Sequence, residues 1–216
     1  LAANTTASYN TAVGMHALVA NTTGAENTAL GAYALKTNTT GSYNTGIGYA
    51  LRLNTTASYN TAIGYQALDA NTTGAGLVAI GYQALAANTT VGNNVAVGNQ
   101  ALKANTTGPY NTALGAYTLD ANTTGQKNTA VGYNALSENT TGTDNTGVGN
   151  LCLDGVTTGH SNSALGSQAG DAVTDGEYNT AIGAYALMTA TTTDYNTALG
   201  SRALQLATTG GDNTAV

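Results

Sequence analysis

The sequence is organised by a glycine that recurs every 17 residues, and this spacing limits the chain to a repeat architecture. Every interval is 17 residues except the one from Gly48 to Gly64, which is 16 because one residue is missing after Gly48. A typical repeat reads N-T-A-I-G-Y-Q-A-L-x-A-N-T-T-G-x-Y, and we number its positions as slots 1 to 17, so that residues 10–26 fill these slots in order. At slot 5 we expect a bend with positive φ or a close backbone approach. The slot 5 glycines are Gly14, Gly31, Gly48, Gly64, Gly81, Gly98, Gly115, Gly132, Gly149, Gly166, Gly183 and Gly200.

The length and composition of each repeat predict an all-β fold, a parallel β-solenoid of 17-residue coils. Two paired helices do not fit into 17 residues that contain two turn signals, and Thr, Asn and Gly are poor helix formers. Short strands that stack from coil to coil need only a few residues per repeat. We therefore expect residues 1–216 to form a single repeat array of about 12 to 13 coils.

Side chains alternate between the two faces of a strand, so slots 2 and 4 share one face. Slot 2 is usually Thr, and slot 4 is always Ile, Val or Leu, as at Val13. We interpret these two slots as the inward face, together with slot 9, which is Leu in eleven of twelve repeats. Because the missing residue after Gly48 lies at a corner, we expect Ile47 and Ile63 to remain in one inward stack.

Slot 3 lies between these two slots and therefore points outward in this interpretation. It holds only Ala or Gly, although a solvent-facing strand position would also accept Thr, Lys or Gln. The absence of larger side chains predicts a second copy of the chain pressed against this column, as in a homotrimer. The alternative is that the faces are inverted and slot 3 is a tight interior position. The proposed inter-chain contact residues are Ala12, Ala29, Gly46, Ala62, Ala79, Ala96, Ala113, Ala130, Gly147, Ala164, Ala181 and Ala198.

The Asn of slot 12 begins an Asn-Thr-Thr-Gly corner, which has turn-forming residues in the right order. Each such Asn also satisfies the N-x-T glycosylation pattern. In the later repeats slot 12 becomes Val156, Val173, Ala190 and Ala207, and such apolar replacements indicate an inward position. We therefore favour a stacked amide ladder, in which each side chain bonds to its neighbours above and below. The proposed ladder consists of Asn21, Asn38, Asn54, Asn71, Asn88, Asn105, Asn122 and Asn139.

Charged residues make up 7% of the chain, and the net charge of −6 comes from scattered carboxylates. This pattern predicts no nucleic-acid partner and no anionic membrane surface as a partner. No apolar run is long enough for a membrane helix, so we expect no membrane insertion by this segment. His16 and His160 fall in different slots nearly nine coils apart, and no metal-ligand or phosphate-loop spacing occurs. We predict no enzyme activity, no catalytic residues, no metal and no cofactor.

All thirteen aromatic residues are Tyr, placed in slot 17 or in slots 6 and 7. We interpret them as corner packing, with a sugar-binding face as the alternative. The single Cys152 stands where other repeats have Ala, which predicts a small buried thiol.

Segments such as residues 58–64 (S-Y-N-T-A-I-G) resemble the N-S-V-A-I-G repeats of YadA-like heads in trimeric autotransporter adhesins. The longer units at residues 105–115 and 122–132 are similar to repeats of bacteriophage tail fibres and of large fibrous surface proteins of bacteria. The resemblance covers essentially the whole chain. It implies three chains, each a left-handed parallel β-roll, packed about a three-fold axis in an extracellular or virion-surface fibre that binds host or matrix surfaces.

These features together predict a structural or adhesive fibre segment, a shaft or a head, whose partners are other copies of itself and a host-surface or matrix receptor. The alternatives are an ice-binding solenoid, suggested by the regular Thr content and the low charge, and a matrix filament that polymerises end to end. The chain begins in slot 9 at Leu1 and stops in slot 4 at Val216, with no polar cap. Because solenoids need capping repeats, we expect further repeats or other domains to flank it.

Overall fold

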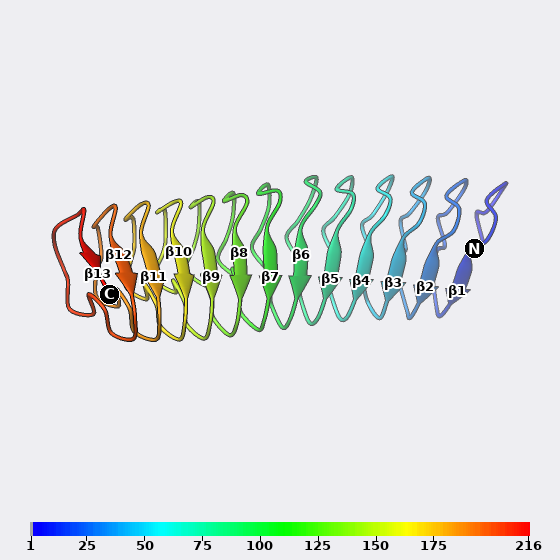
Figure 1. Ribbon diagram of the computed structural model, residues 1–216. Coiled ribbons are helices and arrows are strands. Elements are labelled where there is room, and N and C mark those ends of the chain that lie inside the picture. Colours follow the sequence, from blue (N-terminus) through cyan, green and yellow to red (C-terminus); the bar gives the residue numbers. More distant parts are fainter. Residues whose placement is uncertain (1) are drawn as a thin grey trace. The chain divides into compact units, whose positions relative to one another are not determined.

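The computed structural model describes residues 2–216, so Leu1, the expected slot 9 residue at the start, lies outside the described part. The fold is an all-β, parallel β-solenoid with one short strand per coil (Figure 1). It divides into two compact units, residues 1–109 and residues 110–216. The first unit contains β1 (Thr11–Val13), β2 (Thr28–Leu30), β3 (Thr45–Ile47), β4 (Thr61–Ile63), β5 (Val78–Ile80) and β6 (Val95–Val97). The second contains β7 (Thr112–Leu114), β8 (Thr129–Val131), β9 (Thr146–Val148), β10 (Ser163–Leu165), β11 (Thr180–Ile182), β12 (Thr197–Leu199) and β13 (Thr214–Ala215).

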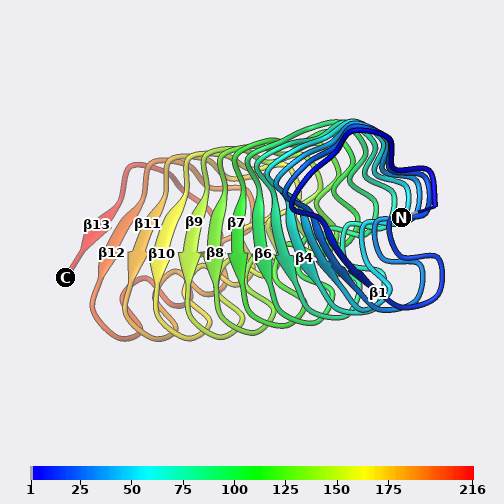
Figure 2. The ribbon, with the colours of Figure 1, turned by 90° about the vertical axis from the view of Figure 1, so that its right-hand side faces the viewer.

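Within each unit, successive strands pair in parallel and in register, slot for slot. The strand occupies only slots 2 to 4, and the rest of each coil is a series of turns that returns the chain to the next strand (Figure 2). These turns also bond from coil to coil: the Leu18 amide donates to the Ala34 carbonyl oxygen at 3.1 Å, and the Thr22 amide to that of Thr39 at 2.9 Å. Each coil is therefore attached to its neighbours along most of its backbone, beyond the strand itself.

The core of each unit consists of slots 3, 8 and 9. The slot 9 leucines of the two units point inward as predicted, and Leu35, Leu68 and Leu136 have no exposed surface. These leucines adopt left-handed backbone conformations, with φ near 50°, as at Leu35 (φ 51°). Gly170, the exception in slot 9, has the same kind of backbone at φ 65°, so the change from Leu to Gly conserves the path of the chain.

The predicted faces of the strand are inverted. Slot 3 is inward, and slots 2 and 4 lie on the outer surface of the coil, so the slot 3 residues cannot form the inter-chain contact expected of them. All of these residues except the half-buried Ala12 are buried inside their own chain. The corrected residues are Ala12, Ala29, Gly46, Ala62, Ala79, Ala96, Ala113, Ala130, Gly147, Ala164, Ala181 and Ala198.

The size of the coil interior explains why the small residue points inward. A β-carbon placed on Gly46 would lie 3.3 Å from Cγ of Leu35 and 3.6 Å from the carbonyl oxygen of Ala50. The slot 3 methyl group therefore fills the space between the slot 9 leucine of the preceding coil and the backbone of its own coil. A branched side chain would not fit there, because protein interiors are close-packed.

The missing residue in the third repeat is absorbed at the corner after Gly48. Ile47 still pairs with Ile63, and the Gln66 amide donates to the carbonyl oxygen of Tyr49, so it is slot 7 that is absent. The expectation that the two isoleucines share one stack is confirmed, but the stack lies on the outer face and both side chains are partly exposed.

Replacing Ala113 by Gln should now destabilise the fold itself, because a large polar side chain would be forced into a filled interior. We expect a loss of about 1–3 kcal/mol in the free energy of unfolding, measured by chemical denaturation followed by circular dichroism. The control is Ser137→Gln in slot 10, which should leave stability unchanged. An Ala113→Gln protein as stable as the original would contradict the inward placement of slot 3.

Candidate functional site

The slot 5 glycines form a column of backbone contacts. All twelve have φ between 91° and 144°, a region that side-chain-bearing residues rarely adopt. A β-carbon on Gly14 would lie 2.6 Å from the carbonyl carbon and oxygen of Gly31 in the next coil. Both reasons for glycine, the positive φ and the close approach, therefore apply at this bend.

The slot 12 asparagines form a buried amide ladder within each unit. Nδ2 of Asn38 donates to Oδ1 of Asn21 at 2.8 Å, and Nδ2 of Asn54 donates to Oδ1 of Asn38 at the same distance. In the second unit Asn139 donates to Asn122 at 2.7 Å. The side chains from Asn21 to Asn139 have no exposed surface, so the folded coil does not present these amides for glycosylation.

A second column of asparagines, at slot 1, was missed in the sequence. Oδ1 of Asn27 accepts a hydrogen bond from the backbone amide of Asn44 at 3.0 Å, and Nδ2 of Asn27 donates to the carbonyl oxygen of Gly41 at 2.8 Å. That carbonyl of slot 15 also accepts Nδ2 of Asn38 at 2.9 Å. The signal was present, because slot 1 is Asn in twelve of thirteen repeats and Leu77 is the exception. The two columns thus meet at one carbonyl oxygen in each coil.

The slot 12 ladder ends inside the second unit. Oδ1 of Asn139 is buried and has no hydrogen-bond partner, because the next residue in the column is Val156. From there the slot is apolar, with Val156, Val173 and Ala190 all fully buried. The column therefore changes from hydrogen bonding to apolar packing without leaving the interior.

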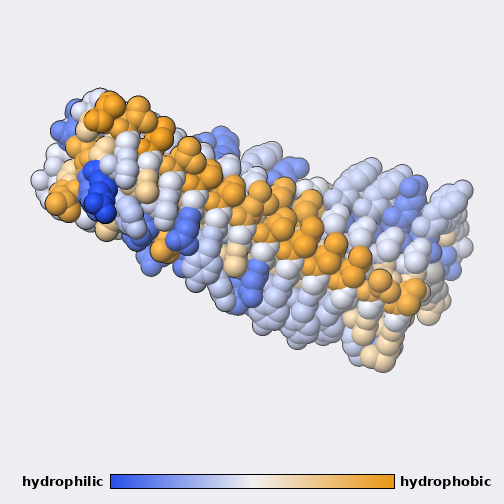
Figure 3. Space-filling model, turned by 60° about the horizontal axis from the view of Figure 1, so that its bottom comes forward, coloured by the Kyte–Doolittle hydropathy of each residue, from blue (hydrophilic) through white to orange (hydrophobic). Residues whose placement is uncertain are grey.

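The outward face of the strands carries an apolar stripe, which we define as the slot 4 residues together with the slot 2 residues beside them. The slot 4 side chains are partly to half exposed, with Val13 at 55%, Leu165 at 52% and Leu30 at 46%. Figure 3 shows the hydrophobic side chains gathered in a narrow stripe on one face. Near Ser163 and Leu165 the stripe contains an apolar hollow of about 220 Å³.

The tyrosines stack from coil to coil at the corners. The rings of Tyr43 and Tyr59 lie 5.0 Å apart and nearly parallel, and those of Tyr178 and Tyr195 lie 5.1 Å apart. Arg52 lies 4.4 Å from the ring centroid of Tyr49. Much of the ring surface thus contacts other side chains of the same chain, which favours corner packing.

The histidines lie in separate surroundings. His16 stacks on Tyr33 at 5.3 Å, and Nε2 of His160 is 3.0 Å from Oε2 of Glu177. Within residues 2–216, no three His, Cys, Asp or Glu side chains are placed to hold a metal ion. The same residues contain no helix that is long and apolar enough to span a membrane.

No protein-family model matches the chain, no curated protein matches its sequence, and no solved structure matches its fold.

Replacing Asn71 by Val should destabilise the first unit. The change removes the hydrogen bonds from Nδ2 to Asn54 (3.0 Å) and to Gly74 (2.9 Å), and it leaves Oδ1 of Asn54 buried without a donor. We expect a loss of roughly 1–3 kcal/mol, measured by chemical denaturation. Thr73→Val, at the exposed slot 14, is the matched control. Equal stability of the two variants would show that the ladder contributes nothing.

Cys152 should be unreactive in the folded protein. The thiol is fully buried, and burial raises its pKa to about 12, so very little thiolate, the reactive form, exists at pH 8. We expect no labelling by a thiol-specific disulfide reagent at pH 8 under native conditions and complete labelling in denaturant. Rapid labelling of the native protein would contradict the burial of slot 8.

Proposed function

We propose that the chain is a structural and adhesive fibre segment, a shaft or head of a bacterial surface adhesin or phage tail fibre, in which three copies associate. Its place is extracellular, on a cell or virion surface, and its role is attachment to a host-surface or matrix receptor, with no catalytic function. The apolar stripe is the observation that carries this proposal. The resemblance to adhesin heads and tail-fibre repeats supports the number of copies and the location.

The stripe is unusual for a surface that faces water. Monomeric proteins rarely expose contiguous apolar patches, and larger ones occur at interaction sites. Here a branched aliphatic side chain recurs on the outer face of every coil, and slots 2 to 4 contain no charged residue in any repeat. Copies with a net charge of −6 can therefore approach along this face without bringing like charges together.

A second copy of the same chain fits the stripe best, because only a partner with the same coil spacing can repeat each contact along it. Covering the exposed half of a slot 4 side chain contributes about 1 kcal/mol, so several adjacent coils give a stable association. The hollow beside Leu165 can receive an aliphatic side chain from another copy. The interface expected at slot 3 is thus reassigned to slots 2 and 4.

One observation favours a second candidate function, binding to ice. The outward slots place a column of Thr beside a column of branched aliphatic residues, and the strand ladder repeats both about every 4.8 Å. Such a regular array of hydroxyl and methyl groups is a possible template for ordered water. A thermal-hysteresis assay separates the two functions, because a stripe covered by other copies should give no hysteresis.

The association is tested by replacing four slot 4 residues of the second unit with Gln: Leu114, Val131, Val148 and Leu165. These side chains point outward, so the variant should keep its circular dichroism spectrum. Its mass by light scattering should fall from three chains to one chain of 21.4 kDa. Four slot 14 substitutions, at Thr124, Thr141, Thr158 and Thr192, are the matched control and should leave the mass unchanged. A monomeric native chain would overturn the proposal, and a trimeric slot 4 variant would exclude the stripe as its interface.

A further inference from the structure

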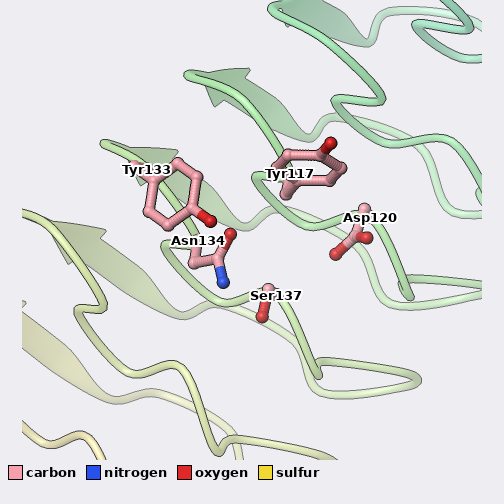
Figure 4. Close-up of a pocket in the computed structure, with 5 residues that line it drawn as sticks. All are labelled: Tyr117, Asp120, Tyr133, Asn134 and Ser137. Carbon is pink, nitrogen blue, oxygen red and sulfur yellow. The ribbon is translucent and has the colours of Figure 1, made fainter.

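A polar pocket lies on the second unit, on a surface separate from the apolar stripe (Figure 4). It has a volume of about 280 Å³ and is lined by Tyr117, Asp120, Tyr133, Asn134 and Ser137. These residues occupy slots 6, 7 and 10 of two successive coils. The rings of Tyr117 and Tyr133 meet edge to face, with centroids 6.0 Å apart at 84°. The pocket therefore combines aromatic surface with three polar side chains.

The polar groups of this pocket are mainly hydrogen-bond acceptors. Oδ1 of Asn134 is buried and has no hydrogen-bond partner. The Ser137 hydroxyl donates to the carboxylate of Asp154, so its oxygen can only accept a further bond. Asp120 contributes a carboxylate, which is also an acceptor when ionised. A complementary ligand would supply several N–H donors and a positive charge.

The same slots bind the chain's own cations elsewhere. In the first unit the slot 10 guanidinium of Arg52 lies 4.4 Å from the ring centroid of Tyr49 and contacts the slot 10 carboxylate of Asp69 at 2.5 Å. Lys36, also in slot 10, lies 5.4 Å from the ring centroid of Tyr33. Tyrosine rings beside an acidic slot 10 are thus a surface on which a cation packs.

The charge of the second unit adds a long-range attraction for cations. Residues 110–216 contain two basic and nine acidic side chains, a formal net charge of −7, whereas residues 1–109 contain three basic and two acidic ones, a net charge of +1. Such an imbalance raises the local concentration of a positively charged partner.

We propose that this pocket binds the guanidinium group of an arginine side chain on a partner protein. A planar guanidinium can lie against the Tyr117 ring while its five N–H groups reach Asp120 and Asn134. A lysine ammonium has three donors on one nitrogen and cannot stack in this way. The identification of the partner as an attachment receptor rests on the proposed function, whereas binding of the guanidinium to the pocket does not.

The experiment titrates the whole chain with N-acetyl-arginine amide and follows binding by saturation-transfer difference NMR. We expect saturable binding, with signals strongest on the guanidinium end of the ligand, and none with the neutral analogue N-acetyl-citrulline amide. Asp120→Asn should weaken binding roughly threefold to tenfold, the effect of one charge near a surface cation. Tyr117→Leu should weaken it as well, and slot 7 already holds Leu at Leu151.

Asn134→Asp is the sharpest variant, because it keeps the acceptor and adds a negative charge. We expect it to tighten binding roughly threefold to tenfold, which a purely structural role of Asn134 would not produce. Thr158→Asp is the matched control, because it adds the same charge to the same unit at slot 14, which holds Asp175 in another coil. It should leave the affinity nearly unchanged.

Equal binding of arginine and citrulline derivatives, or equal effects of Asn134→Asp and Thr158→Asp, would overturn the proposal. Preference for a neutral sugar such as N-acetylglucosamine over the arginine derivative would do the same. The titration is repeated on the slot 4 variant, which is expected to be a single chain. Loss of association with retained arginine binding, or the reverse, tells the failure of one proposal from the failure of the other.

Discussion

The fold depends on two columns of buried amides that meet at one carbonyl oxygen in each coil. Asn27 and Asn38 both donate to Gly41, and their oxygens accept from the coil that follows. Each buried amide is satisfied only when the next coil lies at hydrogen-bonding distance and in the same register, because an unpaired buried polar group is costly. Register, coil spacing and the position of the second corner follow from this requirement. With amides on both sides, the apolar interior is left to one leucine and two small residues in a typical coil.

This narrow interior decides what lies on the surface. There is no room inside for the branched residue of slot 4, so its side chain remains on the outer face of the strand, where it repeats at every coil. In a globular protein such residues would form the core. Here they form a surface that a single chain does not cover, and the self-association that we propose would complete the burial. The same geometry leaves slots 6, 7 and 10 at the surface, where their side chains can vary from coil to coil without disturbing the interior.

Much of this architecture could be predicted from the sequence, because comparing repeats reveals what each slot tolerates. The bend glycines, the inward leucines of slot 9 and the inward position of slot 12 all follow from such comparisons, the last from Val156 and Val173. The faces of the strand could not be assigned in this way. Alternation shows only that Thr61 and Ile63 share a face, and which face is inside depends on what lies across the coil, here Leu51 and its equivalents. Slot 1 was overlooked because Asn next to a turn has a local explanation. The pocket depends on Tyr117 and Asn134 in adjacent coils, a combination that no single repeat displays.

The shortened third repeat has a consequence for how such a chain can be altered. Its coil lacks slot 7, yet Gly48 and Leu51 keep their places and the strands on either side remain paired. The corner after the bend glycine thus tolerates a change in length that the amide columns and the strand do not. Foreign peptides grafted at this corner would project from the fibre at regular steps along its axis. The repeat is in this sense a scaffold for multivalent display, with a separate attachment point available in each coil.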